Sequence, residues 1–193
     1  MIDSNIILEN GYVKLRPMEK EDLIAFTELT EDESMWFYFT SDLSKPGELK
    51  KWVDTGISET ANEKRVAFTI IDKANNRIAG STSFGNISYT DKRIEIGWTW
   101  LGKEYQGKGI NDHVKFLMLK YCFENNDFER VEFKTDILNV AARNALKRIG
   151  AIEEGTLRSH TLMTHKRRRD TVYYSILRDE WEGIKTTSKI NID

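Results

Sequence analysis

The sequence predicts an α/β fold of the α+β kind, in which helices cover both faces of a mixed, mostly antiparallel sheet. Three observations carry this prediction. Segments of alternating polarity are separated by segments of helical spacing, strand-type segments gather in antiparallel groups toward both ends of the chain, and a strand–helix–strand–helix unit lies between them. With 193 residues, of which 39% are hydrophobic, the chain is long enough for one core of ordinary size.

The first third of the chain predicts one strand followed by two helices. Residues 12–18, YVKLRPM, alternate in polarity, and their pairing should stop near Pro17. Residues 19–29 place Leu23, Phe26 and Leu29 at helical spacing, and Pro46 is typical of a first helical turn. We therefore expect one helix over residues 19–29 and a second that opens at Pro46.

The remainder of the chain predicts six more strands and two more helices. The Asn-Asn pair at 75–76 marks a turn, Gly97 marks a bulge or a close approach, and Gly150 closes the last helix. The expected strands cover residues 65–72, 77–87, 93–101, 130–136, 151–163 and 171–177, and the expected helices cover residues 109–125 and 139–150. Trp98 and Trp100 should share one face of their strand and lie in the core.

Composition and charge exclude several classes of protein. The net charge of -2 gives no general attraction for nucleic acid, and the single cysteine, Cys122, excludes an internal disulfide and a cysteine-based metal cluster. The N-terminal residues lack the basic start and apolar stretch of a signal peptide, and no segment has the roughly 20 apolar residues of a membrane span. We expect a cytoplasmic protein with one domain over residues 1–182, a polar, frayed tail over residues 183–193, and no metal ion or membrane partner.

The most informative segment is EYQGKGIN, residues 104–111, which lies between a predicted strand and an amphipathic helix. Gly107 and Gly109 let the backbone pass close to a bulky anion, and the N–H groups and dipole of the helix start attract it. The plain alternative is a strand-to-helix turn that uses glycines. A nucleotide P-loop needs Ser or Thr after its lysine to hold magnesium, and here Gly109 follows Lys108. The segment therefore predicts a phosphate site of another kind.

This loop resembles the pyrophosphate loop of the GNAT acetyltransferases, and more narrowly that of their RimJ/RimL-like branch. The family pattern is Gln/Arg-x-x-Gly-x-Gly/Ala, for which this chain supplies Gln106, Gly107, Lys108, Gly109, Ile110 and Asn111. Asn111 departs from the pattern by adding bulk, although its N–H remains available. Further resemblance lies, in the expected order, in residues 15–23, 94–101, 138–151, 153–158 and 169–181. The resemblance implies a GNAT fold with about six to seven strands, splayed at the centre and flanked by about four helices.

The resemblance further implies that acetyl-coenzyme A binds across the splay. Its pantetheine arm would add to the exposed strand edge at residues 99–101, where one N–H would polarise the acetyl carbonyl. Asn139 would contact the cofactor or a water while also capping its helix, and Asn144 would meet the phosphates or face solvent. The cofactor-binding residues so implied are Thr99, Trp100, Leu101, Gln106, Gly107, Lys108, Gly109, Ile110, Asn111, Asn139 and Asn144.

The resemblance also places a base in the same strand. Glu95 lies inside an apolar run, where many family members carry the glutamate that accepts the proton of the attacking amine. The alternative is an outward glutamate paired with Arg93 or with a neighbouring strand. Sequence alone leaves both interpretations open.

The usual acid for the departing thiolate is missing. Leu146 stands where many family members have a tyrosine, and Ala142 stands where the RimL-like branch often has a serine. Tyr174, or a water held by Asn139, could substitute. The catalytic residues that we expect are therefore Glu95, Asn139 and Tyr174.

Two functions of different classes follow. The first is an N-acetyltransferase that acts on a protein N-terminus or on a small-molecule amine, and the second is a domain that holds acyl-coenzyme A with little catalysis. The acceptor wall should be aromatic at residues 35–40, MWFYFT, and basic near residues 160–170, which favours peptides over polyamines. The basic run HKRRRD, residues 165–170, is otherwise a solvated turn, a dimer contact or a docking site for an acidic partner.

Overall fold

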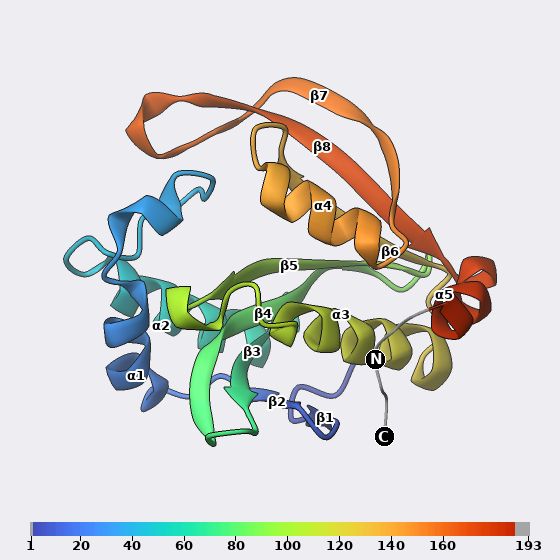
Figure 1. Ribbon diagram of the computed structural model, residues 1–193, viewed down its shortest axis with the longest axis horizontal. Helices are drawn as coiled ribbons and strands as arrows, with labels where there is room; N and C mark the ends of the chain where they lie inside the picture. The colour runs from blue at the N-terminus through green and yellow to red at the C-terminus, as the bar shows by residue number, and fades with distance from the viewer. Residues whose placement is uncertain (1, 188–193) are drawn as a thin grey trace.

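An eight-stranded sheet organises the structure, and its strands follow the order β1-β2-β3-β4-β5-β6-β8-β7. The computed structural model describes residues 2–187, and Figure 1 shows their arrangement. β5 and β6 are parallel, whereas the other neighbouring strands pair antiparallel. The strands are β1 (Leu8–Glu9), β2 (Val13–Pro17), β3 (Arg65–Asp72), β4 (Arg77–Ser88), β5 (Arg93–Leu101), β6 (Arg130–Asp136), β7 (Ile152–Leu162) and β8 (Arg168–Leu177).

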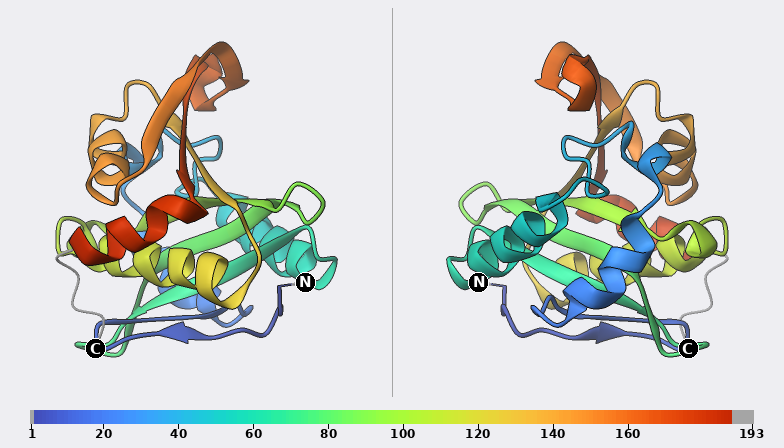
Figure 2. Two further views of the ribbon diagram at one scale, coloured as in Figure 1. Left: turned by 90° about the vertical axis from the view of Figure 1, so that its right-hand side faces the viewer. Right: turned by 90° about the vertical axis from the view of Figure 1, so that its left-hand side faces the viewer.

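Helices cover both faces of the sheet (Figure 2). Trp100 of β5 contacts Phe26 and Trp52 on one face, and Phe84 of β4 stacks on Tyr121 on the other. The helices are α1 (Asp22–Thr30), α2 (Glu48–Ala61), α3 (Ile110–Lys120), α4 (Val140–Arg148) and α5 (Trp181–Thr187), and a π-helical turn over Tyr121–Asn125 continues α3. The first two helices therefore lie on the Trp100 face, and α3 lies on the Phe84 face.

Local sequence explains where several of these elements begin and end. Gly47 precedes α2 with φ 79°, and Gly150 follows α4 with φ 88°, a backbone conformation that glycine adopts at little cost. The side chain of Asn139 caps α4 by accepting a hydrogen bond of 3.0 Å from the Ala142 N–H. The expected strands and helices are thus present, with bounds that differ by a few residues.

Two elements add to the seven strands and four helices expected from sequence. β1 is a two-residue strand at the edge of the sheet, and α5 follows β8. The ring of Trp181 is 2% exposed and lies against Phe116 and Phe123, which fixes α5 on the α3 side of the molecule. The boundary expected at residue 182 falls inside α5, and residues 188–193 of the expected tail lie outside the described residues.

A bulge in β5 corrects one expectation about the core. The pairing of β4 with β5 shifts register between Ser81 and Ser83, and Trp98 adopts φ 52° at that point. Trp100 is buried as expected, but the side chain of Trp98 is 38% exposed and lies over Gly85. Trp98 is therefore a surface aromatic, because the bulge interrupts the alternation on which the core assignment depended.

No helix within residues 2–187 is long and apolar enough to span a membrane. In the same part of the chain, no group of three or more His, Cys, Asp or Glu side chains is arranged to hold a metal ion.

Candidate active site

The sheet opens between its two parallel strands. β5 and β6 pair only from Arg93 to Glu95, opposite Arg130 to Glu132. Beyond these residues β5 stays bound to β4 and β6 stays bound to β8, so the two halves of the sheet diverge, as Figure 1 shows. Within residues 2–187, the facing edges of β5 and β6 therefore have no strand partner past Glu95.

Peptide groups of β5 point into this opening. A Cβ built on Gly80 of β4 would overlap the Trp100 carbonyl oxygen, which shows that the Trp100 peptide group points toward β4. Since the backbone groups of successive residues in a strand point to opposite sides, the N–H and C=O of Leu101 face the opening, and its C=O accepts the hydrogen bond of the Gln106 side chain. Of the three residues expected to bind pantetheine, Leu101 thus turns its N–H toward the opening, whereas the ring of Trp100 is buried.

The glycine loop before α3 presents free amides. Gly107 and Gly109 have φ 72° and 81°, and no described residue lies within 4 Å of a Cβ built on either. Crowding by the described residues is therefore not what favours glycine at these positions, whereas the positive φ angles do favour it. Within the described residues, none of the five backbone N–H groups of residues 107–111 donates a hydrogen bond to the protein.

Five free amides at the start of an 11-residue helix form a cradle for an anion. The turn directs the N–H groups outward, and the helix dipole adds a partial positive charge at the same place. The Gln106 side chain donates a hydrogen bond of 2.9 Å to the Leu101 carbonyl oxygen and so ties the loop to the end of β5. Lys108 is exposed, Asn111 is half-buried, and the Ile110 side chain is buried as the anchor of the helix start. The loop fits a pyrophosphate group.

The two asparagines expected on the second cofactor helix lie in different surroundings. Asn139 is half-buried and its Oδ1 caps α4, so its amide group remains for a ligand or a water. Asn144 is exposed and, among the residues described, makes no hydrogen bond to the protein through its side chain. Leu146, which occupies the place of the tyrosine expected by resemblance, is buried in the core.

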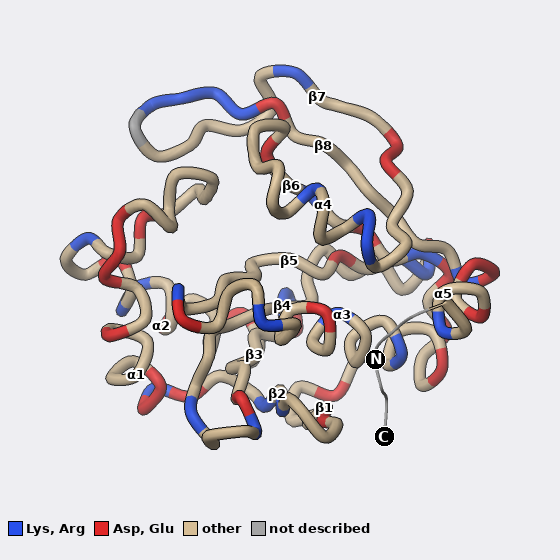
Figure 3. Tube along the Cα trace, viewed as in Figure 1, with Lys and Arg blue, Asp and Glu red and all other residues tan. Residues whose placement is uncertain are grey.

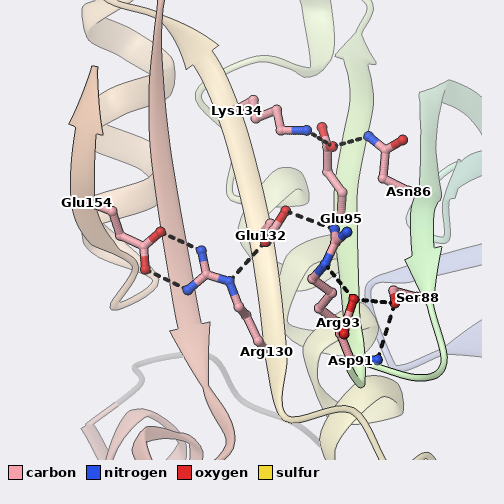
Figure 4. Close-up of polar contacts among 9 residues, drawn as sticks. All are labelled: Asn86, Ser88, Asp91, Arg93, Glu95, Arg130, Glu132, Lys134 and Glu154. Carbon is pink, nitrogen blue, oxygen red and sulfur yellow. Dashed lines mark hydrogen bonds and ion pairs between the residues drawn. The ribbon is translucent and has the colours of Figure 1, made fainter. Parts of the chain in front are cut away.

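Glu95 lies where β5 and β6 part, and it is 7% exposed. Its Oε2 accepts a hydrogen bond of 2.6 Å from Lys134 Nζ and one of 2.5 Å from Asn86 Nδ2 (Figure 4). Its Oε1 accepts no hydrogen bond from the described residues and would lie 3.1 Å from a Cβ built on Gly97. The carboxylate is thus paired with a neighbouring strand, as one interpretation of the sequence held, while one oxygen stays free.

The partner of Glu95 is a charged lysine. Burial alone would lower the pKa of Lys134, but the hydrogen bond and the charge of Glu95 outweigh burial and raise that pKa. Lys134 Nζ also lies 5.1 Å from the centre of the Tyr173 ring. The ammonium group therefore fixes the orientation of Glu95 without covering Oε1.

A ladder of alternating charges holds the closed end of the splay. Arg130 bridges Glu132 at 2.9 Å and also pairs with Glu154 on β7, and Arg93 lies 3.8 Å from Glu132 (Figure 4). These pairs join β5, β6 and β7 across the sheet. They fix the point from which the two halves diverge.

Tyr174 lies on the other face of the sheet from Glu95. In β8 it pairs with Phe133, whereas Tyr173 pairs with Lys134, so the Tyr174 side chain points away from the Glu95–Lys134 pair. Its hydroxyl donates a hydrogen bond of 2.8 Å to Glu153 and accepts one of 3.2 Å from Arg143. Burial raises the pKa of Tyr174. The structure does not bring Tyr174 and Glu95 together.

Sequence reasoning missed a buried lysine beneath the β5 edge. Lys115 of α3 is 5% exposed, and its Nζ donates a hydrogen bond of 2.6 Å to Thr99 Oγ1 and lies 3.4 Å from Thr82 Oγ1. Burial lowers the pKa of Lys115 to about 7. The only sequence signal is a lysine between two apolar residues, Val114 and Phe116, and that pattern also fits a solvated position.

The segment after α1 meets the tip of the β7–β8 hairpin. Thr164 Oγ1 donates a hydrogen bond of 3.5 Å to the Phe39 carbonyl oxygen, and the Arg167 guanidinium lies 5.0 Å from the centre of the Phe37 ring. Arg167 also pairs with the buried carboxylate of Asp136. The two segments expected to form the acceptor wall are thus in contact, and Figure 3 shows the basic residues at the hairpin tip.

The sequence model of a protein family, described as "Acetyltransferase (GNAT) domain", matches residues 13–152 of this chain. The chain is 36% identical over 108 residues to "Putative ribosomal N-acetyltransferase YdaF" of Bacillus subtilis (strain 168), a match that spans 56% of this chain and 58% of YdaF. It is 25% identical over 170 residues to the spermidine N(1)-acetyltransferase of Escherichia coli (strain K12), over 88% of both chains.

Solved structures share the same architecture. The GCN5-related N-acetyltransferase from Brucella melitensis superposes with a TM-score of 0.84 at 26% identity, over 94% of this chain and 83% of the other. The ribosomal-protein-S5-alanine acetyltransferase from Vibrio fischeri superposes with a TM-score of 0.74 at 19% identity, over 91% and 98%. The second likeness is one of fold.

Proposed function

The chain belongs to the GNAT acetyltransferase family, and we propose that it transfers an acetyl group from acetyl-coenzyme A to a primary amine by direct attack in a ternary complex. The observation that carries this proposal is the pairing of two features at one opening of the sheet. Free amides of residues 107–111 lie on one side of it, and the unpaired Oε1 of Glu95 lies at its vertex.

On the cofactor side, the loop of residues 106–111 would hold the pyrophosphate through its amides. The backbone groups of residues 99–101 that face the opening would hydrogen-bond the pantetheine arm, and one of their N–H groups would polarise the acetyl carbonyl. Asn139 and Asn144 would contact the arm and the phosphates from α4. When bound, acetyl-coenzyme A supplies an activated thioester, whose carbonyl carbon the amine attacks.

On the acceptor side, Glu95 would accept the proton that the amine must lose. The amine is a nucleophile only when neutral, so a group that takes its proton directly or through a water lowers the barrier. Lys134 and Asn86 hold Oε2, which leaves Oε1 as the accepting atom. Burial of the carboxylate limits the water that would compete for this oxygen.

The acceptor is an amine on a protein N-terminus or on a small molecule. The name of YdaF points to ribosomal proteins, and that of the Escherichia coli relative points to spermidine. The basic hairpin tip favours the first class, because a polycation would meet the arginines at residues 167–169. A cytoplasmic location agrees with both classes.

A thiol-release assay with a panel of amines tests the proposal. The purified chain is mixed with acetyl-coenzyme A and, in turn, with peptides bearing a free N-terminus, amino acids, spermidine and an aminoglycoside. We expect amine-dependent release of coenzyme A with at least one acceptor. Tight binding of acetyl-coenzyme A in calorimetry, with no release above the amine-free rate for any acceptor, would instead identify an acyl-coenzyme A-binding domain.

A further inference from the structure

Three consecutive arginines in the β7–β8 hairpin have different partners. Arg167 pairs with the buried Asp136 and donates a hydrogen bond to the Phe37 carbonyl oxygen. Arg168 is exposed, and its guanidinium donates to the backbone and hydroxyl oxygens of Ser159. Arg169 has no carboxylate within ion-pair distance in the described part of the chain.

The partners of Arg169 are two neutral hydroxyls. Its Nε donates a hydrogen bond of 2.9 Å to Thr171 Oγ1, and its Nη2 lies 3.5 Å from Thr161 Oγ1. A guanidinium has five N–H groups, so three donors remain for another ligand. The side chain is half-buried, and burial lowers the pKa of Arg169. An arginine that is partly removed from water without a counter-ion is costly, and a bound anion would offset that cost.

Arg169 faces the same space as the proposed base. Arg169, Thr171 and Tyr173 alternate along β8 and so share one face, and Tyr173 pairs with Lys134, the partner of Glu95. Burial lowers the pKa of Arg169, and the negative charges of Asp136 and Glu95 act in the opposite direction. Each is already paired with another cation, the first with Arg167 and the second with Lys134. Among the described residues of this wall, Arg169 is therefore a cation without a carboxylate partner.

We infer that Arg169 binds a carboxylate of the acceptor, which makes an amine followed by an acidic group the preferred substrate. The inference rests on the proposed function and narrows its substrate class. A guanidinium can bind a carboxylate through two parallel N–H···O bonds, and its remaining donors allow this without breaking the bond to Thr171. The carboxylate can belong to an acidic side chain next to a peptide N-terminus or to the side chain of a free acidic amino acid.

Matched acceptors and variants test the inference. Two C-terminally amidated peptides that differ only by Glu or Gln at their second position are compared, and free glutamate against glutamine forms the second arm. In the wild type we expect kcat/KM to favour the acidic peptide by about 10-fold to 100-fold, the range of a charge-assisted hydrogen bond. In Arg169→Gln the two peptides should be used about equally, with the KM for acetyl-coenzyme A unchanged. Preference for glutamate with none for the acidic peptide would assign the subsite to amino acids.

Arg158→Gln is the control, because its side chain lies on the same hairpin, is exposed and lies outside the basic wall of residues 160–170. It should keep the full preference of the wild type. Arg169→Lys retains the charge but loses the planar guanidinium, so it should keep part of the preference for the acidic acceptor. This variant still tests the inference if Arg169→Gln fails to fold. A wild type without preference in either arm, or an Arg169→Gln variant that keeps the preference, would overturn the inference.

Calorimetry separates this inference from the proposed function. The acidic peptide is titrated into wild type and Arg169→Gln in the presence of coenzyme A. Binding that depends on Arg169 without turnover of any amine would refute the acetyltransferase and keep the carboxylate subsite. Turnover of neutral and acidic acceptors at equal rates in both arms would keep the acetyltransferase and refute the subsite.

Discussion

On the α3 side of the splay, the backbone amides of residues 107–111 donate to nothing in the described chain, whereas on the hairpin side Glu95 and Asp136 are each already paired with a cation. The first surface is built from one short segment of backbone. The second is built from side chains that meet from β5, β6, β8 and the segment after α1. A phosphate cradle can therefore be local in sequence, whereas an acceptor wall depends on long-range packing.

The largest expected effect lies at the vertex between the two surfaces. Glu95→Gln removes the accepting oxygen, and we expect kcat near pH 7 to fall by roughly 10²–10⁴-fold, the usual contribution of a general base. Affinity for acetyl-coenzyme A, measured by calorimetry, should barely change, because Glu95 lies on the acceptor face.

Glu132→Gln is the matched control for that variant. Glu132 belongs to the charge ladder on the neighbouring strand and pairs with Arg130 and Arg93. Its loss should change kcat by less than about threefold, as is usual for residues away from the reacting groups. Near-normal activity of Glu95→Gln at pH 7 would reduce Glu95 to a structural partner of Lys134.

The second-largest effect is expected on coenzyme A affinity, at the amide cradle of residues 107–111. Gly109→Val should weaken coenzyme A binding about 100-fold, because a β-branched residue resists φ 81° and its side chain enters the space in front of the cradle. Isothermal titration of the folded variant measures this loss. Unchanged affinity would show that the loop is an ordinary strand-to-helix turn.

Gly109→Asn separates the two reasons for glycine at this position. Asparagine tolerates the left-handed conformation better than other residues, yet its side chain points into the same open space as that of valine. Recovery of most of the affinity in the asparagine variant would assign the effect to backbone conformation. Equal loss in both variants would assign it to occupied ligand space.

The same contrast explains which parts of the molecule could be predicted. The element order follows from hydrophobic spacing, and the cradle follows from two glycines before an amphipathic helix, because both depend on neighbouring residues. The exposure of Trp98 depends on one backbone angle in a bulge, and α5 depends on the docking of Trp181 against α3. The pairing of Arg167 with Asp136, and the lack of a described carboxylate partner for Arg169, need the register of β6 with β8 and cannot be seen in the run of arginines alone.

Lys115 of α3 is buried beneath the cofactor side of the splay, and its charge affects the stability of the fold. The folded chain lowers the pKa of Lys115 from 10.5 to about 7 by burial. Between about pH 7 and 10.5 the unfolded chain binds a proton that the folded chain lacks, so this group makes the free energy of unfolding rise with pH in that window. Below about pH 7 the buried lysine is charged in both states, and its full cost is present.

Lys115→Met should therefore stabilise the protein at neutral pH. Methionine has a similar volume and no charge, and we expect the free energy of unfolding at pH 7 to rise by about 2 kcal/mol, within the range for replaced buried charges. Urea unfolding at pH 7 and pH 9 should show a smaller pH dependence than in the wild type. A wild type and a variant with equal pH dependence would contradict the lowered pKa.

The smallest expected effect concerns Tyr174, the candidate acid. Its hydroxyl proton is already donated to Glu153, and its ring lies on the opposite face of the sheet from Glu95. Tyr174→Phe should lower stability by about 1 kcal/mol, the cost of one hydrogen bond, and should lower kcat by less than about threefold. Coenzyme A thiolate is a fair leaving group, so turnover without a side-chain acid is chemically reasonable. The measurement is the pH profile of kcat for both proteins at saturating acceptor. A drop of about 100-fold in the variant, with loss of the descending limb at high pH, would restore Tyr174 as the acid.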